Sequence, residues 1–148
     1  MLSLHNMFDR NKIKRLVEKM PKGLMSIMTI LLITYLSLDD NPFDANDVRL
    51  FEGMDKVVHC IMYWFLALIL MIDWTKINNN IKISAVSMWV CVAIAFAFSA
   101  LMEYLQDAMG LGRAASWADA LANFTGTILG FLSMKFVFNK WFFDTKQG

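Results

Sequence analysis

Charge and chain-breaking residues are scarce in this sequence. Only 18% of its 148 residues are charged, against about 25% in soluble domains, and it contains 2 prolines and 2 cysteines. So small a charged fraction argues against an ordinary soluble enzyme. The 14 basic and 13 acidic residues nearly cancel, so the chain has no long-range field of one sign to attract a nucleic acid. We therefore expect no nucleic-acid partner.

Hydrophobic residues take the place of the missing charge. They make up 57% of the chain, with 12 methionines and 12 phenylalanines among them, and the mean hydropathy is +0.46. A chain of this length is expected to fold as one domain. The composition therefore predicts a polytopic membrane protein.

Four charge-free runs mark candidate membrane spans. They are Gly23–Leu38, Val57–Ile72, Ile83–Met102 and Ala120–Met134, the last extending back to Ala114 if Asp119 is admitted. A helix needs about 20 residues to cross a bilayer, and the shorter runs reach that length with polar flanks at headgroup depth. The alternative, a compact soluble bundle, would need a polar outer stripe that these runs lack. We predict an all-α fold with four transmembrane helices, at about 23–38, 56–73, 83–106 and 116–138.

The cations are unevenly distributed about these spans. Residues 1–22, the 73–82 loop and the C-terminal tail carry 11 of the 14 cations, and Lys and Arg favour the cytoplasmic side. Both termini are therefore expected in the cytoplasm. The first run could be a signal peptide, but no small-residue cleavage site follows it, which favours a retained helix.

Three segments follow from this arrangement. Residues 1–22 are predicted to be a cytoplasmic amphipathic segment, either an interfacial helix on the inner leaflet or a frayed tail. Residues 23–138 form the four-helix membrane domain, and residues 139–148 form a cytoplasmic tail.

Polar residues gather at the outer ends of three predicted spans. Because the second and fourth spans start outside and the third ends there, these residues should meet within about two turns of the surface. They are Asp55, His59 and Tyr63 on the second span, Glu103 and Gln106 on the third, Arg113 and Ser116 at the start of the fourth, and Asp119 and Asn123 farther along it. Below them, Gly126 and Gly130 form a Gly-xxx-Gly step that lets another helix approach closely.

The cost of charge in lipid suggests how these groups are arranged. A charged group facing hydrocarbon costs about 2.5–3.5 kcal/mol on insertion scales, so Glu103 and Asp119 are expected to face each other, His59 and Arg113. We take His59, Glu103 and Asp119 as candidate catalytic residues, because histidine titrates near neutrality and paired carboxyl groups suit acid–base chemistry. The candidate ligand-binding residues are Asp55, Tyr63, Gln106, Arg113, Ser116 and Asn123.

The same residues resemble the signature of a known family. The strings Asp55-Lys56-x-x-His59-x-x-x-Tyr63-x-x-Leu66, Glu103-x-x-Gln106 and Arg113-x-x-Ser116-x-x-Asp119-x-x-x-Asn123-x-x-Gly126-x-x-x-Gly130 are similar to those of VanZ-like membrane proteins. Family members are small helical membrane proteins, and the founding member is associated with resistance to glycopeptide antibiotics, teicoplanin in particular. The resemblance implies a multi-pass protein of the bacterial cytoplasmic membrane with a cell-envelope role. It implies no settled reaction.

Two classes of function remain open. In the first, an extracytoplasmic site binds or acts on an anionic envelope lipid or a lipid-linked cell-wall precursor, Arg113 grips a phosphate or carboxylate, and the protein contributes to glycopeptide resistance. In the second, the protein is a non-enzymatic scaffold or partner-binding protein, the polar cluster is a structural clasp, and Asp55 and Ser116 cap their helices.

The expected partners are accordingly membrane lipids, with a lipid-linked cell-wall precursor or a glycopeptide as the more specific ligands. No cofactor is expected, although His59, Glu103 and Asp119 could together hold a divalent metal ion.

Overall fold

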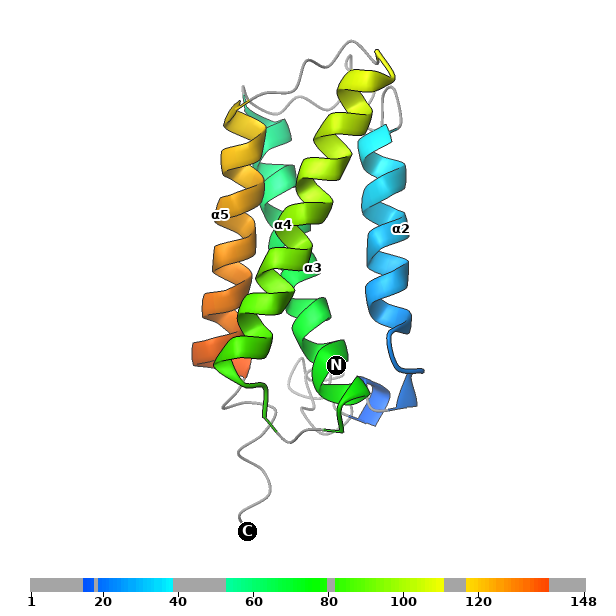
Figure 1. Ribbon diagram of the computed structural model, residues 1–148, viewed down its shortest axis with the longest axis vertical. Coiled ribbons are helices and arrows are strands. Elements are labelled where there is room, and N and C mark those ends of the chain that lie inside the picture. The colour runs from blue at the N-terminus through cyan, green and yellow to red at the C-terminus, as the bar shows by residue number, and fades with distance from the viewer. Residues whose placement is uncertain (1–14, 18, 39–52, 80–81, 111–116, 139–148) are drawn as a thin grey trace, which may run out of the picture.

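The described part of the chain is helical. The computed structural model describes residues 15–17, 19–38, 53–79, 82–110 and 117–138. These residues form four long helices and contain no strand (Figure 1). The helices are α2 (Leu24–Leu38), α3 (Met54–Ile77), α4 (Ala85–Ala108) and α5 (Trp117–Ser133), which the π-helix η2 (Met134–Phe138) continues. The predicted all-α fold is confirmed.

Three of the helices are long and apolar enough to cross a membrane. They are α3 and α4, of 24 residues each, and the 21-residue segment Trp117–Val137 formed by α5 and η2. The apolar α2 is shorter, with 15 residues, and together with the three long helices it can make up the four predicted spans. Large apolar side chains such as Leu31, Val86 and Leu121 lie exposed around the bundle, as on a surface that faces acyl chains. The chain is a membrane protein.

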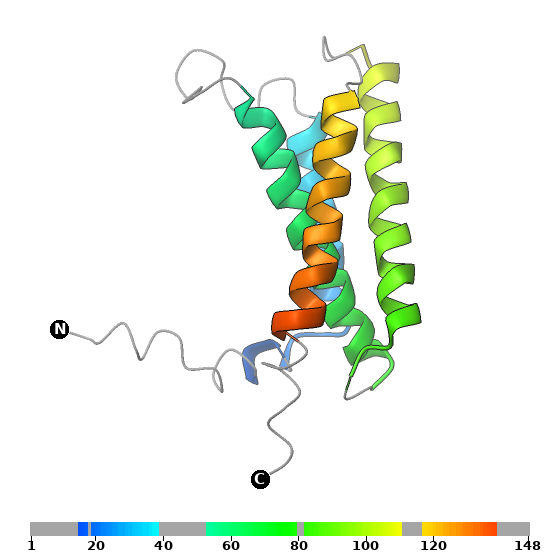
Figure 2. The same ribbon diagram turned by 90° about the vertical axis from the view of Figure 1, so that its left-hand side faces the viewer.

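The helices run alternately in opposite directions. At the upper end of the bundle in Figure 1, α2 and α4 end while α3 and α5 begin. We call this the upper end and the opposite one the lower end. The helix α2 packs on α3 and α4, on the side away from α5 (Figure 1). Figure 2 shows that α3 and α4 diverge toward the upper end.

The closest helix pair is α3 with α5. A Cβ atom at Gly126 would overlap the backbone carbonyl of Cys60, and one at Gly130 would lie 2.7 Å from Ala67 Cβ and 2.8 Å from the Trp64 carbonyl oxygen. Only glycine leaves room for backbones at this separation, as the Gly-xxx-Gly step predicts. The step holds the second half of α5 against residues 60–68 of α3 and so limits which polar residues of the two helices can meet.

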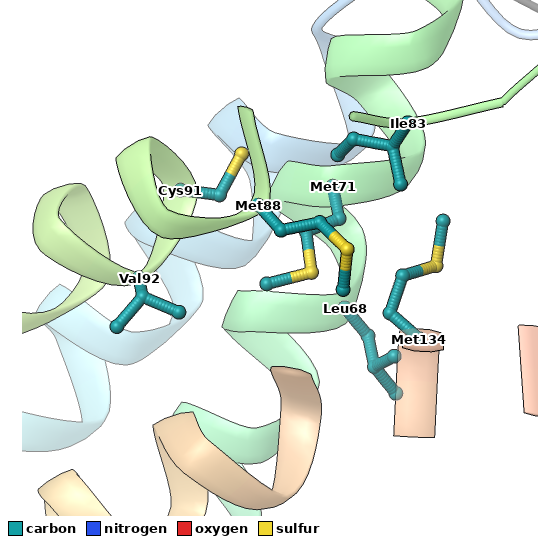
Figure 3. Close-up of a cluster of buried hydrophobic side chains, with 7 residues drawn as sticks. All are labelled: Leu68, Met71, Ile83, Met88, Cys91, Val92 and Met134. Carbon is teal, nitrogen blue, oxygen red and sulfur yellow. The ribbon is translucent and has the colours of Figure 1, made fainter. Parts of the chain in front are cut away.

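An apolar core fills the lower half of the bundle. It is built of side chains from α3, α4 and the end of the α5–η2 segment, together with one from the residues before α4 (Figure 3). Its buried members are Leu68, Met71, Ile83, Met88, Cys91, Val92 and Met134. A second buried cluster consists of Ile33, Tyr63, Leu66 and Ala95 and joins α2 to α3 and α4. The polar residues at the upper end therefore lie above an apolar core.

A buried acidic residue joins α2 to α3 at the lower end. The carboxylate of Asp73, whose residue is 1% exposed, accepts hydrogen bonds at Oδ2 from the Ser26 backbone N–H (2.8 Å) and hydroxyl (2.9 Å). Lys76 Nζ lies 3.8 Å from the other carboxylate oxygen and donates to the carbonyls of Val17 (2.7 Å) and Met20 (3.0 Å). This clip fixes the start of α2 and the residues just before it.

Several sequence predictions fall outside the described residues. Most of the amphipathic segment expected at 1–22 and the whole tail at 139–148 lie there. So do Arg113 and Ser116, which stand in the sequence between the end of α4 and the start of α5.

Candidate functional site

The side-chain amide of Asn123 is the centre of a polar cluster at the upper end. Its nitrogen Nδ2 donates to Ser99 Oγ (2.9 Å) and to Glu103 Oε1 (3.1 Å), and its oxygen Oδ1 lies 3.1 Å from His59 Nδ1. Asn123 is 1% exposed, and these hydrogen bonds satisfy its buried amide. One side chain of α5 thereby joins α3 to α4.

Depth along the helices explains why these residues meet. His59 lies in the second turn of α3, Glu103 lies in the last turn but one of α4, and Asn123 lies in the second turn of α5. The close approach of α3 and α5 at Gly126 brings the amide within reach of the imidazole. The structure thus places His59, Glu103 and Asn123 together.

The two acidic residues of the cluster are neighbours. Glu103 is half-buried and interacts electrostatically with both Asp119 and His59. The oxygen Oδ1 of Asp119 is buried and has no hydrogen-bonding partner among the residues that the structure describes. A buried carboxylate oxygen without a hydrogen-bond donor is costly, so this atom is the least satisfied part of the cluster.

Tyr63 lies beneath the cluster. It is 1% exposed, its ring lies 6.4 Å from that of Phe98, and its hydroxyl lies beside Ser99. The ring of Tyr63 thus has an apolar neighbour in Phe98, while its hydroxyl group lies on the side of the polar cluster.

Ser99 is the member of the cluster that sequence reasoning missed. It is buried on the same face of α4 as Glu103, four residues earlier. A single serine in an apolar helix does not by itself predict a functional site. The four-residue spacing from Glu103, which puts both residues on one helical face, was the feature that could have identified Ser99.

Two predicted ligand-binding residues lie apart from the cluster. The Gln106 amide nitrogen donates to the carbonyl oxygen of Ser37 (2.7 Å) and so ties α4 to the last turn of α2. Asp55 is exposed and pairs with its neighbour Lys56 at 3.5 Å. Asp55 also does not cap α3, because Gly53 occupies the N-cap position without a side-chain hydrogen bond.

The described acidic and histidine side chains do not form a metal site. No group of three or more His, Cys, Asp or Glu residues in the described ranges could hold a metal ion. The amide of Asn123 stands between His59 and Glu103 instead, bonded to both. The arrangement favours hydrogen-bonding and acid–base chemistry over metal coordination.

The cluster combines groups that can donate, accept and exchange protons. Glu103 and Asp119 accept hydrogen bonds when ionised, and the imidazole of His59 does both. These groups lie at the upper end of the bundle, above the apolar core of its lower half.

The chain is similar to a known protein family. The chain matches the family model described as VanZ/LLP1 over residues 4–139. No curated protein and no solved structure matches the chain.

Proposed function

The chain belongs to the VanZ/LLP1 family, and on that premise we propose that its polar cluster binds the head group of an anionic envelope lipid or of a lipid-linked cell-wall precursor. The protein is proposed to lie in the bacterial cytoplasmic membrane, with the upper end of the bundle facing outward. Binding or modification of such a ligand would be its route to glycopeptide resistance, including resistance to teicoplanin.

The unsatisfied carboxylate of Asp119 is the observation that carries this proposal. Its buried Oδ1 lacks a donor among the described residues, next to a second acid, Glu103. A hydroxyl, amide or ammonium group of a ligand would supply the missing hydrogen bond. Sugar, peptide and glycerol head groups all carry such donors, whereas acyl chains do not.

The anionic part of the ligand is assigned to Arg113 from the sequence alone. Guanidinium groups bind phosphate and carboxylate in a bidentate manner, and Arg113 stands six residues before Asp119. We propose that Arg113 binds the ligand's phosphate or carboxylate while Asp119 and Glu103 accept hydrogen bonds from its neutral groups. His59 would exchange a proton with the bound head group.

A structural clasp is the second candidate function. The observation that favours it is the saturation of Asn123, whose amide bonds to Ser99, Glu103 and His59 on two other helices. In this case the cluster fixes the bundle, and the protein serves as a scaffold or binds a protein partner. Removal of Asp119 separates the two functions. It should lower ligand binding if the cluster is a ligand site, and it should leave a structural clasp almost unchanged, because Asp119 Oδ1 makes no hydrogen bond to the described residues.

Lipid retention provides the first test. We expect the purified wild-type protein to retain a specific anionic lipid or lipid-linked precursor that mass spectrometry detects. Asp119→Ala and Arg113→Ala should lower the retained amount about tenfold or more, since a hydrogen bond to a charged group contributes about 1.5–3 kcal/mol. Asp107→Ala is the matched control, because Asp107 is an exposed acid at the end of α4.

The thermal stability of the same variants separates the two functions. Normal melting with lost lipid and lost glycopeptide resistance supports the ligand site. Equal lipid retention in Asp119→Ala, Arg113→Ala and Asp107→Ala would contradict it. Unfolding of Glu103→Ala, whose carboxylate accepts from Asn123, together with normal melting and unchanged lipid content in Asp119→Ala, would support the clasp.

The orientation of the bundle can be tested independently. Asp107 at the upper end and Asn79 at the lower end are both exposed, and Cys60 and Cys91 are the chain's two cysteines. In a cysteine-free background, a membrane-impermeant maleimide added to intact cells should label the Asp107→Cys variant and leave Asn79→Cys unlabelled. The reverse pattern would place the cluster on the cytoplasmic side and exclude an outer-leaflet site.

A further inference from the structure

The hydrogen-bonding partners of Asn123 are not interchangeable. An ionised carboxylate can only accept hydrogen bonds, so the group that faces Glu103 Oε1 at 3.1 Å must be the Asn123 nitrogen. The hydroxyl of Ser99 can donate or accept and fits either orientation of the amide. Glu103 therefore determines which way the amide points, and its oxygen is left facing His59 Nδ1 at 3.1 Å.

The orientation of the Asn123 amide determines which of the two ring nitrogens of His59 carries the hydrogen. An amide oxygen can only accept, so Nδ1 of His59 must carry the hydrogen of the bond that joins them. A neutral imidazole has a single N–H, so its other nitrogen, Nε2, keeps a free lone pair. We infer that Asn123 is a positioning residue that holds His59 in the Nδ1–H tautomer and leaves Nε2 as the basic nitrogen of the site.

The reverse arrangement has a specific requirement. If the amide were turned over, its oxygen would face Glu103, which would then have to be protonated and donate a hydrogen bond. The nitrogen Nδ2 would donate to His59 Nδ1, and the hydrogen of the imidazole would move to Nε2. The two arrangements thus place opposite tautomers on His59, and the tautomer reports which one exists.

The tautomer of His59 limits which chemical groups of a ligand can bind at the proposed site. This consequence rests on the proposed function. A basic Nε2 accepts a hydrogen bond or a proton, so it suits a head group that presents a hydroxyl or another O–H donor. No described residue bonds to Nε2, since Nδ1 makes the one hydrogen bond that the described residues give this ring. The tautomer itself does not depend on any ligand.

Nuclear magnetic resonance of labelled histidine tests the tautomer directly. The chain has 2 histidines, so in a His5→Gln background His59 gives the only imidazole signals. Two-bond ¹H–¹⁵N correlation spectra of the full chain in lipid nanodiscs, at a pH where imidazole is neutral, should show the Nδ1–H pattern. An Nε2–H pattern, which predominates in free histidine, would overturn the inference.

Substitutions at one position then test whether Asn123 is the cause. Asn123→Ala should lose the Nδ1–H pattern and gain the Nε2–H pattern, whereas Asn123→Asp keeps an acceptor and should retain Nδ1–H. Thr125→Ala, at an exposed position of the same helix, should leave the spectrum unchanged. Retention of Nδ1–H in Asn123→Ala would show that another group holds the ring.

Failure of this inference can be told apart from failure of the proposed function. The wild-type spectrum decides the tautomer even if the Asn123→Ala variant does not fold. Lipid retention is measured on other variants, Asp119→Ala and Arg113→Ala. A lipid-binding protein with an Nε2–H tautomer would refute the positioning role alone.

Discussion

Replacing Gly126 with alanine is expected to lower the free energy of unfolding by about 3 kcal/mol, because the added methyl group has no space. Its Cβ would overlap the carbonyl of Cys60 and lie 3.0 Å from the backbone nitrogen of Trp64. A flexible side chain could rotate away, but these backbone atoms can move only if α3 and α5 separate. The expected loss of stability is therefore at the upper end of the usual range for overpacked substitutions, about 1–3 kcal/mol.

The same separation should disturb the polar cluster. Asn123 lies one turn before Gly126, and its contact with His59 Nδ1 already spans 3.1 Å. A shift of α5 away from α3 lengthens this hydrogen bond first, while Ser99 and Glu103 on α4 keep theirs. Gly126→Ala is thus expected to weaken lipid retention as well as stability.

Unfolding in mixed micelles, followed by tryptophan fluorescence, measures the effect of Gly126→Ala on stability. Thr125→Ala is the matched control, since an exposed position on the same helix should change stability by within about 0.5 kcal/mol. Gly130→Ala should fall between the two, because one of its close neighbours is the methyl group of Ala67, at 2.7 Å. Equal stability of Gly126→Ala and Thr125→Ala would mean that the helices adjust without cost.

The spans were predictable because the bilayer imposes a simple requirement. A run without charge and of sufficient length must form a helix in lipid, and α3, α4 and α5 appear where such runs lie. The end of α3 was less predictable. Its charge-free run stops at Ile72, yet the helix continues to Ile77, and the buried carboxylate of Asp73 accepts two hydrogen bonds at Oδ2 from Ser26 on a different helix.

The meeting of polar groups was partly predictable for a related reason. Depth along each helix follows from residue number, so His59, Glu103 and Asn123 could be assigned to one level of the bundle. The rotation of each helix about its axis could not be assigned in this way. Gln106 shares a helical face with Glu103 by spacing, but its amide contacts the Ser37 carbonyl on α2.

The hydrogen-bonding partners within the cluster could not be predicted from the sequence. Asn123 stood among the candidate ligand-binding residues, yet its amide is occupied by three neighbouring side chains. Such an assignment depends on distances of a few ångström between helices. Spacing in the sequence limits these distances only to within a helical turn.

Replacing Asp73 with alanine is expected to lower the free energy of unfolding by about 3 kcal/mol, through the loss of two hydrogen bonds to a charged group. The Ser26 backbone N–H and hydroxyl, at 2.8 and 2.9 Å from the carboxylate, would be left without an acceptor at the start of α2. Lys76 would lose its neighbouring charge but would keep the carbonyls of Val17 and Met20. Because Lys76 keeps these two hydrogen bonds, the loss should stay at the lower end of the range for a broken buried ion pair, about 3–5 kcal/mol.

Asp73→Asn separates the contribution of the charge from that of the acceptor. An amide oxygen can still accept from Ser26, so this variant should lose about half as much stability as Asp73→Ala. Unfolding in mixed micelles compares both variants with Asp107→Ala, which removes an exposed acid. If Asp73→Ala were as stable as Asp107→Ala, water or lipid head groups would have to replace the carboxylate at Ser26. The clip would then not be what holds α2 against the bundle.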